Sequence, residues 1–129
     1  MQSTSPTVLV VEDNDVVSDF LEGALRAYGY RVLLAATPDQ AVEQCRHESS
    51  AICALIADVR LGGRDGFKTA CMLMPIHPEM KVIFTSGYPF EHLVRDGLLP
   101  ADLQKTMFLQ KPFLPSEIKS LLSILVRPA

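Results

Sequence analysis

Five short runs of apolar residues recur along the chain, each separated from the next by a longer segment of mixed polarity. None of the five runs alternates with polar residues, and each contains β-branched or large apolar side chains. Uninterrupted runs of this length are typical of strands buried on both faces of a parallel sheet. The predicted strands are residues 8–11, 32–35, 52–57, 82–84 and 107–109.

The segments between these runs have the periodicity of amphipathic helices. The first carries an apolar stripe at Val17, Phe20, Leu21, Ala24 and Tyr28. Gly29 is expected to end that helix in the left-handed conformation that glycine tolerates. Thr37 and Pro38 predict the N-cap and first residue of the second helix.

Three further helices are expected, and the fourth of the five is predicted to be the weakest. The third carries a stripe at Phe67, Ala70, Cys71 and Met74, and the last begins near Pro115 with Ile118, Leu121, Leu122 and Leu125. Pro89, Gly97 and Pro100 interrupt the segment between them, so we expect a short or irregular fourth helix at about residues 90–97.

Alternating strands and helices predict a doubly wound α/β sandwich, with helices on both faces of a parallel sheet. Ligands of this architecture bind outside the carboxyl ends of the strands. The 129 residues match the size of one domain.

Net charge, apolar runs and cysteine spacing limit the kinds of partner that the protein could bind and the cellular compartment in which it could lie. A net charge of −3 argues against direct nucleic-acid binding. No apolar run approaches the ~20 residues that a membrane span needs, and the N-terminus lacks the basic region of a signal peptide. The three cysteines, Cys45, Cys53 and Cys71, have no zinc-ligand spacing. We expect all three as reduced thiols in or near the core, which favours a cytoplasmic protein.

Polar side chains follow four of the predicted strands. Because the carboxyl ends of parallel strands meet at one edge of the sheet, we expect these side chains to converge in one cleft. They are Glu12 and Asp13 after the first strand, Asp58 after the third, Thr85 and Ser86 after the fourth, and Lys111 after the fifth.

Three carboxylates in one cleft repel each other, and a divalent cation would remove that conflict. Oxygen ligands without cysteine or histidine favour Mg²⁺, which usually also binds a phosphate oxygen. The Lys111 ammonium and the Thr85 hydroxyl suit phosphoryl oxygens. Each residue alone has a simpler interpretation: Asp13 or Asn14 as a helix N-cap, Asp58 in a loop, and Lys111 as a solvated lysine.

Four segments in order resemble the receiver domain of two-component response regulators: VLVVEDN (8–14), DVRLGGRDG (58–66), VIFTSGYP (82–89) and FLQKPF (108–113). The resemblance implies one receiver domain over residues 1–129 with its core at 7–126, and a five-stranded sheet of order 2-1-3-4-5 flanked by five helices. The last two segments are most similar in style to receivers of hybrid histidine kinases. We therefore expect either a stand-alone receiver or the receiver of a hybrid kinase.

The resemblance also implies a role for each strand-end residue. Asp58 matches the phosphorylated aspartate, and Thr85 and Phe108 match the switch hydroxyl and the switch aromatic. Lys111 matches the family's lysine and precedes an expected cis peptide bond to Pro112. The Mg²⁺ ligands that it implies are Glu12, Asp13, Asp58 and the backbone carbonyl of Arg60.

Three features depart from the common family pattern. Glu12 replaces the commoner aspartate while keeping its charge, and Gly62 stands where many members have proline. The reduced fourth helix puts the usual signalling face in question. Arg60 and Gly87 each lie two positions beyond a phosphoryl-site residue. One hypothesis is that Arg60 screens the phosphoryl group from water and so sets its lifetime, and the alternative is a solvated side chain.

The leading hypothesis is phosphorelay signalling, in which Asp58 accepts a phosphoryl group from a phosphohistidine on a histidine kinase or histidine phosphotransfer domain. The alternative is a partner-binding pseudo-receiver that acts without phosphorylation. A third hypothesis is a Mg²⁺-dependent phosphohydrolase, which usually needs an acidic residue at the position that Arg60 takes. We therefore expect an acceptor domain rather than a multiple-turnover enzyme, and the sequence leaves homodimerisation open.

Overall fold

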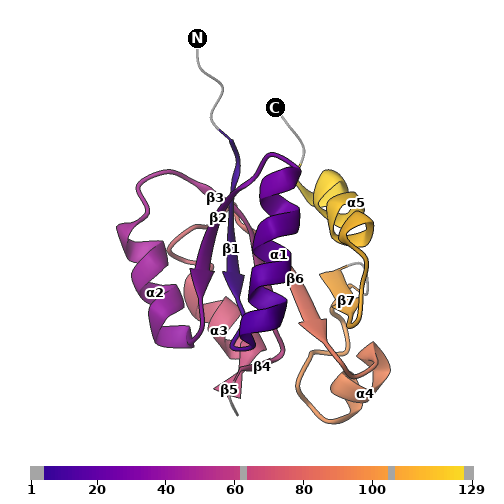
Figure 1. Cartoon of the computed structure of the whole chain (residues 1–129). Helices are drawn as coiled ribbons and strands as arrows, with labels where there is room; N and C mark the ends of the chain where they lie inside the picture. The colour runs from indigo at the N-terminus through magenta and orange to yellow at the C-terminus, as the bar shows by residue number, and fades with distance from the viewer. Residues whose placement is uncertain (1–4, 62–63, 105–106, 127–129) are drawn as a thin grey trace.

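The computed structural model describes residues 5–61, 64–104 and 107–126. Its main sheet contains five parallel strands in the order β2-β1-β3-β6-β7 (Figure 1). This is the 2-1-3-4-5 order expected from the resemblance, once the two short strands β4 and β5 are set aside. The strands are β1 (Thr7–Val11), β2 (Arg31–Ala35), β3 (Ile52–Asp58), β6 (Lys81–Ser86) and β7 (Phe108–Gln110).

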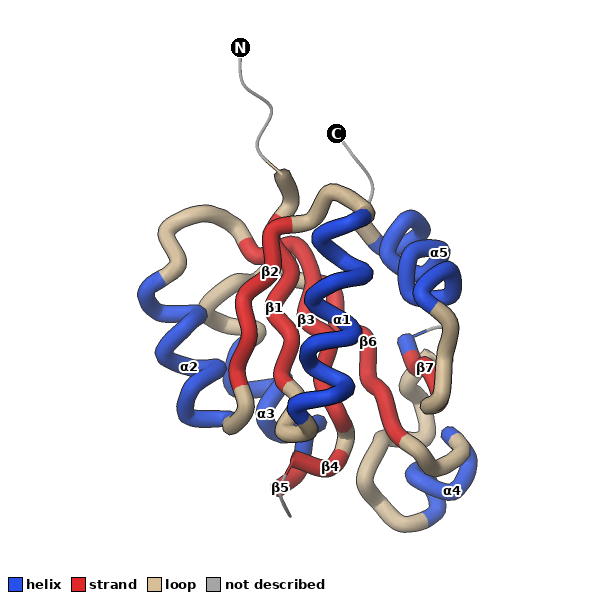
Figure 2. The backbone as a smooth tube through the Cα atoms, viewed as in Figure 1, coloured by secondary structure: helices blue, strands red, loops and turns tan. Residues whose placement is uncertain are grey.

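Helices cover both faces of this sheet, as the tube in Figure 2 shows. Two of them, α1 (Asp15–Ala27) and α5 (Pro115–Leu125), pack on one face. On the other face lie α2 (Pro38–His47) and α3 (Gly66–Leu73), with the short α4 (Phe90–Arg95) near β7. The predicted doubly wound architecture is therefore confirmed.

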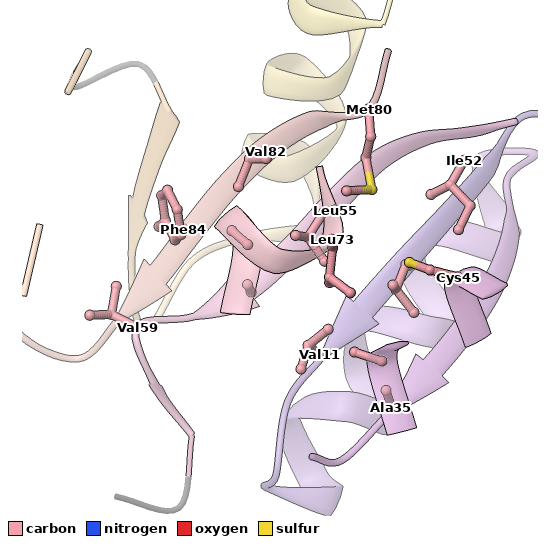
Figure 3. Packing of buried hydrophobic residues seen from close by; sticks show 14 of the residues in the cluster. Val11, Ala35, Cys45, Ile52, Leu55, Val59, Leu73, Met80, Val82 and Phe84 are labelled. Carbon is pink, nitrogen blue, oxygen red and sulfur yellow. The ribbon is translucent and has the colours of Figure 1, made fainter. Parts of the chain in front are cut away.

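Side-chain alternation along the central strands divides the core into two clusters, one for each face. Toward α1 and α5, one cluster joins strand residues such as Val10 and Ile56 to the fully buried Ile118. Toward α2 and α3, the other joins Leu55 and Phe84 to helical residues, as Figure 3 shows from close by. Strands buried on both faces explain why their sequences contain uninterrupted apolar runs.

The predicted helix ends rest on local hydrogen bonds. The Thr37 side chain accepts a hydrogen bond from the backbone N–H of Gln40 at 3.1 Å, and Pro38 is the first residue of α2. Gly29 has a φ of 93°, which confirms the left-handed turn after α1. The N-cap of α1 is Asn14, whose Oδ1 accepts from the backbone N–H of Val17, so Asp13 is not the cap.

Several strand boundaries differ from the sequence prediction. Asp58 is the last residue of β3, and β6 runs through Ser86, so these polar residues end the strands rather than follow them. A short antiparallel pair, β4 (Arg60–Leu61) and β5 (Arg64–Asp65), was not predicted. Gly62 lies outside the described residues.

The predicted apolar stripe of α3 was right for Ala70, which is buried, and for Phe67, which packs against the core, but wrong for Cys71 and Met74, which are exposed. Its buried residues are Gly66, Thr69, Ala70 and Leu73, whereas Met74 is exposed. The buried face also includes a glycine and a threonine, which hydropathy alone does not select. Cys71 is exposed, so the expectation that all three cysteines lie in or near the core fails for this one.

The interrupted segment after β6 forms the six-residue helix α4, as its proline and glycine pattern predicted. Within the described parts of the chain, no helix combines the length and apolar character that crossing a bilayer requires.

Gly66 allows the start of α3 to lie directly against the end of β3. A Cβ atom at this position would be 2.0 Å from the Asp58 carbonyl oxygen and 2.9 Å from the Val59 Cα. The backbone N–H of Gly66 also donates to the Val59 carbonyl at 2.7 Å. Only glycine fits at this position, because any Cβ atom would overlap the backbone at the end of β3.

We predict that Gly66→Ala lowers the free energy of unfolding by about 1–3 kcal/mol, since backbone atoms must move to admit the methyl group. Gly23→Ala in α1 is the matched control, because a Cβ there meets nothing within 4 Å. It should raise the stability by about 0.5–1 kcal/mol. Urea denaturation measures both, and equal stabilities of Gly66→Ala and the wild type would contradict the packing argument.

Candidate functional site

Four polar side chains emerge on the same face and at the same edge of the sheet. Glu12, Asp58, Thr85 and Lys111 each lie two positions beyond a strand residue of the cluster that faces α1 and α5: Val10, Ile56, Ile83 and Leu109. Residues two apart on a strand point to the same face. Backbone hydrogen bonds extend the ladder beyond β1 and β7, from Glu12 N to the Ala35 carbonyl at 3.0 Å and from Lys111 N to the Ser86 carbonyl at 2.8 Å.

The Lys111 ammonium joins two of these groups. Its Nζ lies 2.7 Å from Glu12 Oε1 and 2.6 Å from Asp58 Oδ2. Glu12 is 3% exposed and Asp58 9%, whereas the Lys111 side chain is 22% exposed. The ammonium thus closes a network whose two carboxylates are almost entirely removed from water.

The other carboxylate oxygens accept hydrogen bonds from the backbone. The N–H of Asn14 donates to Glu12 Oε2 at 3.1 Å, and the N–H of Arg60 donates to Asp58 Oδ1 at 3.0 Å. Both donors belong to the residue two positions after the carboxylate. The loops after β1 and β3 therefore fix the orientation of both side chains.

Burial and charge shift the pKa of two members of the network. The pKa of Glu12 is raised, chiefly by burial and further by the Asp58 charge, although hydrogen bonds from Lys111 and Asn14 oppose the shift. Burial lowers the pKa of Lys111, but its hydrogen bonds to Asp58 and Glu12 outweigh burial and raise it overall. The site therefore favours the protonated form of Lys111 and disfavours the ionised form of Glu12.

A third carboxylate, that of the exposed Asp13, borders the same network. One oxygen from each of Glu12, Asp13 and Asp58 lies within 4.8 Å of the others. One ammonium cannot balance three negative charges, and a hard divalent cation prefers such an all-oxygen set. The donor set therefore fits Mg²⁺, as the sequence predicted.

The two predicted switch residues occupy different layers. Thr85 is 1% exposed and is the register partner of Asp58, and its carbonyl accepts from the Val59 N–H at 2.9 Å. Phe108 is half-buried, and its ring centroid lies 5.6 Å from that of Phe90 in α4. Thr85 is thus beside Asp58, whereas Phe108 packs with the core on the other face of the sheet.

The sequence reasoning missed Tyr88, which contacts Arg60 near this edge, and Gly66 at the start of α3. The guanidinium of the exposed Arg60 lies over the ring of Tyr88, with its Cζ 5.2 Å from the centroid. A tyrosine directly after the Thr85-Ser86-Gly87 segment was an available signal, as was the glycine at the start of α3. The expected cis peptide bond between Lys111 and Pro112 is present.

Sequence comparisons agree with this geometry. Residues 8–123 match the model of the response regulator receiver domain. Sensor kinase CckA of Brucella abortus is 39% identical over 111 residues, covering 86% of this chain and 11% of CckA. Transcriptional regulatory protein AruR of Pseudomonas aeruginosa is 30% identical over 95% of this chain and 50% of its own length. The chain therefore spans half or less of these relatives.

Solved structures show the same fold. The receiver domain of a sensor histidine kinase from Pseudomonas aeruginosa PAO1, solved with magnesium in its active-site cleft, has a TM-score of 0.80 and 27% identity, covering 97% of this chain and all of that one. The receiver domain of PhyR from Erythrobacter litoralis has a TM-score of 0.78 and 28% identity, covering 97% and 95%. The sheet order, the acidic edge and the match over residues 8–123 together show that the chain belongs to the response regulator receiver domains of two-component signalling.

Proposed function

We propose that this receiver accepts a phosphoryl group on Asp58 from a phosphohistidine of a histidine kinase or histidine phosphotransfer domain. The observation that carries the proposal is the position of Asp58, whose two oxygens accept from the Lys111 ammonium and the Arg60 N–H at the strand edge. The three other polar side chains of this edge, Glu12, Asp13 and Thr85, then have roles in the same reaction.

In the transfer step, an Asp58 carboxylate oxygen attacks phosphorus in line with the phosphorus–nitrogen bond of the donor. That bond breaks with its electron pair moving to the imidazole nitrogen. The donor ring keeps the proton on its other nitrogen and therefore leaves as neutral imidazole. The product is an acyl phosphate on Asp58. Lys111, already 2.6 Å from Asp58 Oδ2, neutralises charge on the transferred oxygens.

Glu12, Asp13, Asp58 and the backbone carbonyl of Arg60 would hold Mg²⁺. The bound ion would supply positive charge to the carboxylates and the phosphoryl oxygens. Thr85, in register with Asp58, is suited to donate its hydroxyl hydrogen to a phosphoryl oxygen.

The proposed output is a repacking of the opposite layer. If Thr85 moves toward the new phosphoryl group, the Phe108 ring gains space to turn inward from its contact with Phe90. That rotation would alter the surface formed by α4, β7 and α5, which a partner or a second copy of the chain could read. A local change of charge is thereby coupled to a packing change in the neighbouring layer.

Two competing functions predict different behaviour. A pseudo-receiver would bind partners without phosphorylation and would need no cation site. A phosphohydrolase would need an acid at the position of Arg60, which cannot serve as a general acid at neutral pH. Cytoplasmic location and the absence of direct nucleic-acid contact remain predictions from the sequence.

Incubation with acetyl phosphate and Mg²⁺ should add one phosphate-sized mass to the wild-type chain, measured by intact-protein mass spectrometry. Asp58→Asn should abolish the adduct, because an amide oxygen is too poor a nucleophile. Asp39→Asn, in the exposed first turn of α2, is the control and should leave the adduct intact. An adduct that survives Asp58→Asn would contradict the assignment, and no adduct on the wild type would favour the pseudo-receiver.

An exposed apolar groove beside the acceptor suits the donor protein. Its volume is about 500 Å³, and it is lined by Val16, Val17, Phe20, Lys111, Pro112 and Phe113. Lys111 contacts both the groove and Asp58, so a protein that presents a phosphohistidine to Asp58 would cover the groove. Phe20 is 41% exposed although its helical stripe predicted burial, and its ring packs edge-on against Phe113.

We predict that Phe20→Asp slows transfer from a phosphorylated histidine phosphotransfer domain at least about ten-fold, since a desolvated apolar contact of 1.4 kcal/mol or more is lost. Phosphorylation by acetyl phosphate should be unchanged, because the small donor needs no protein surface. Ile124→Asp, on the exposed side of α5 and away from the groove, is the matched control. Equal slowing with both donors would show damage to the site and contradict the docking role.

A further inference from the structure

Arg60 and Tyr88 connect the two segments that flank the acceptor, namely β4 after β3 and the loop after β6. Arg60 lies two positions after Asp58 at the end of β3, and Tyr88 lies three positions after Thr85 at the end of β6. Their side chains meet with the guanidinium Cζ 5.2 Å from the ring centroid. The contact therefore bridges neighbouring strands at the edge that carries Asp58.

The Tyr88 ring is held in place by its own surroundings. The backbone N–H of Tyr88 donates to Ser86 Oγ at 3.1 Å, which fixes the loop after β6. On α4, the His92 ring lies 5.6 Å from the Tyr88 ring at an interplanar angle of 40°. Tyr88 is nevertheless 49% exposed, so it contributes little to the core. These contacts suit the ring to act as a platform for the guanidinium.

Arg60 is anchored close to the acceptor. Its backbone N–H is 3.0 Å from Asp58 Oδ1, so its flexible side chain begins within a few ångströms of the carboxylate that would carry the phosphoryl group. A guanidinium has five N–H donors, and contact with an aromatic face leaves several of them for oxygen acceptors. The ring and a phosphoryl group can therefore hold Arg60 at the same time.

We propose that Tyr88 is a positioning residue that holds the Arg60 guanidinium beside the acyl phosphate on Asp58, and thereby lengthens the lifetime of that phosphate. The inference rests on the proposed phosphorylation of Asp58. Arg60 acts by pairing with phosphoryl oxygens and by occupying space through which water approaches. Tyr88 acts through Arg60, because it limits the many rotamers of an exposed arginine to those near the site.

The reaction that the pair slows is hydrolysis. Water attacks phosphorus, and the bond between phosphorus and the Asp58 oxygen breaks with its electron pair on the carboxylate. The products are the Asp58 carboxylate, inorganic phosphate and a proton released to solvent. The Arg60 guanidinium remains protonated throughout and is not consumed.

The test is the first-order loss of the phosphate adduct after acetyl phosphate is removed by rapid desalting, with Mg²⁺ present, followed by mass spectrometry. Arg60→Ala and Tyr88→Ala should each shorten the half-life about two- to five-fold, the range expected for one exposed cation–π contact. Tyr88→Phe should retain the wild-type half-life, since it keeps the ring. Tyr88→Leu, which keeps apolar bulk without a ring, should behave like Tyr88→Ala.

The double variant Arg60→Ala/Tyr88→Ala should decay no faster than Arg60→Ala alone, because Tyr88 has no other route to the phosphate. Arg46→Ala, an exposed arginine of α2, is the control and should not change the half-life. Unchanged decay in Tyr88→Ala, or effects that multiply in the double variant, would overturn the inference. Absence of any wild-type adduct would instead contradict the proposed function.

Discussion

The ion pairs from one lysine ammonium to two buried carboxylates are the interaction on which the edge of the sheet depends. Lys111 lies 2.7 Å from Glu12 and 2.6 Å from Asp58, and it connects the loop after β7 with the ends of β1 and β3. Without that cation, two almost fully buried carboxylates would face each other unpaired, which is costly in an apolar surrounding. The Lys111 ion pairs therefore stabilise two buried carboxylates that apolar packing alone would destabilise.

The negative charges of this network are not fully balanced by the Lys111 ammonium. Asp13 adds a third carboxylate, and burial together with the Asp58 charge raises the pKa of Glu12 despite the nearby ammonium. Because folded Glu12 binds its proton more tightly than the unfolded chain does, its contribution to stability is present below pH 4.5 and is lost as the pH rises through the raised pKa. A bound divalent cation would relieve this unfavourable ionisation, which connects the electrostatics of the fold with the chemistry expected of a receiver.

Much of this arrangement follows from the sequence, because the strands and the site depend on the same alternation of side chains. The apolar runs located all five strands of the main sheet, and four of the polar residues predicted at the strand ends, Glu12, Asp13, Asp58 and Lys111, lie together in the structure. The cap at Thr37 and the turn at Gly29 were predictable because both depend on local backbone chemistry. The short α4 was predictable from its proline and glycine positions.

Features that depend on tertiary packing were not predictable in this way. The buried face of α3 includes Gly66, whose place is set by the Asp58 carbonyl, and no hydropathy pattern records that contact. Cys71 is exposed, although its place in a helical apolar stripe suggested burial. Phe20 lies in the predicted stripe of α1, yet it is exposed beside Phe113 because the groove leaves one side of its ring uncovered. The contact between Arg60 and Tyr88 joins β4 to the loop after β6, and these segments are far apart in sequence.

The most direct test of this account is the pKa of the Glu12 side-chain carboxyl in Mg²⁺-free protein, followed by ¹³C NMR across a pH titration. The account predicts a value above 4.5, a further rise in Lys111→Met, which removes the ammonium, and a fall when Mg²⁺ is added. A Glu12 pKa at or below 4.5 that neither Lys111→Met nor Mg²⁺ changes would contradict the account. It would show that burial does not disfavour ionised Glu12 and that nearby positive charge does not stabilise it.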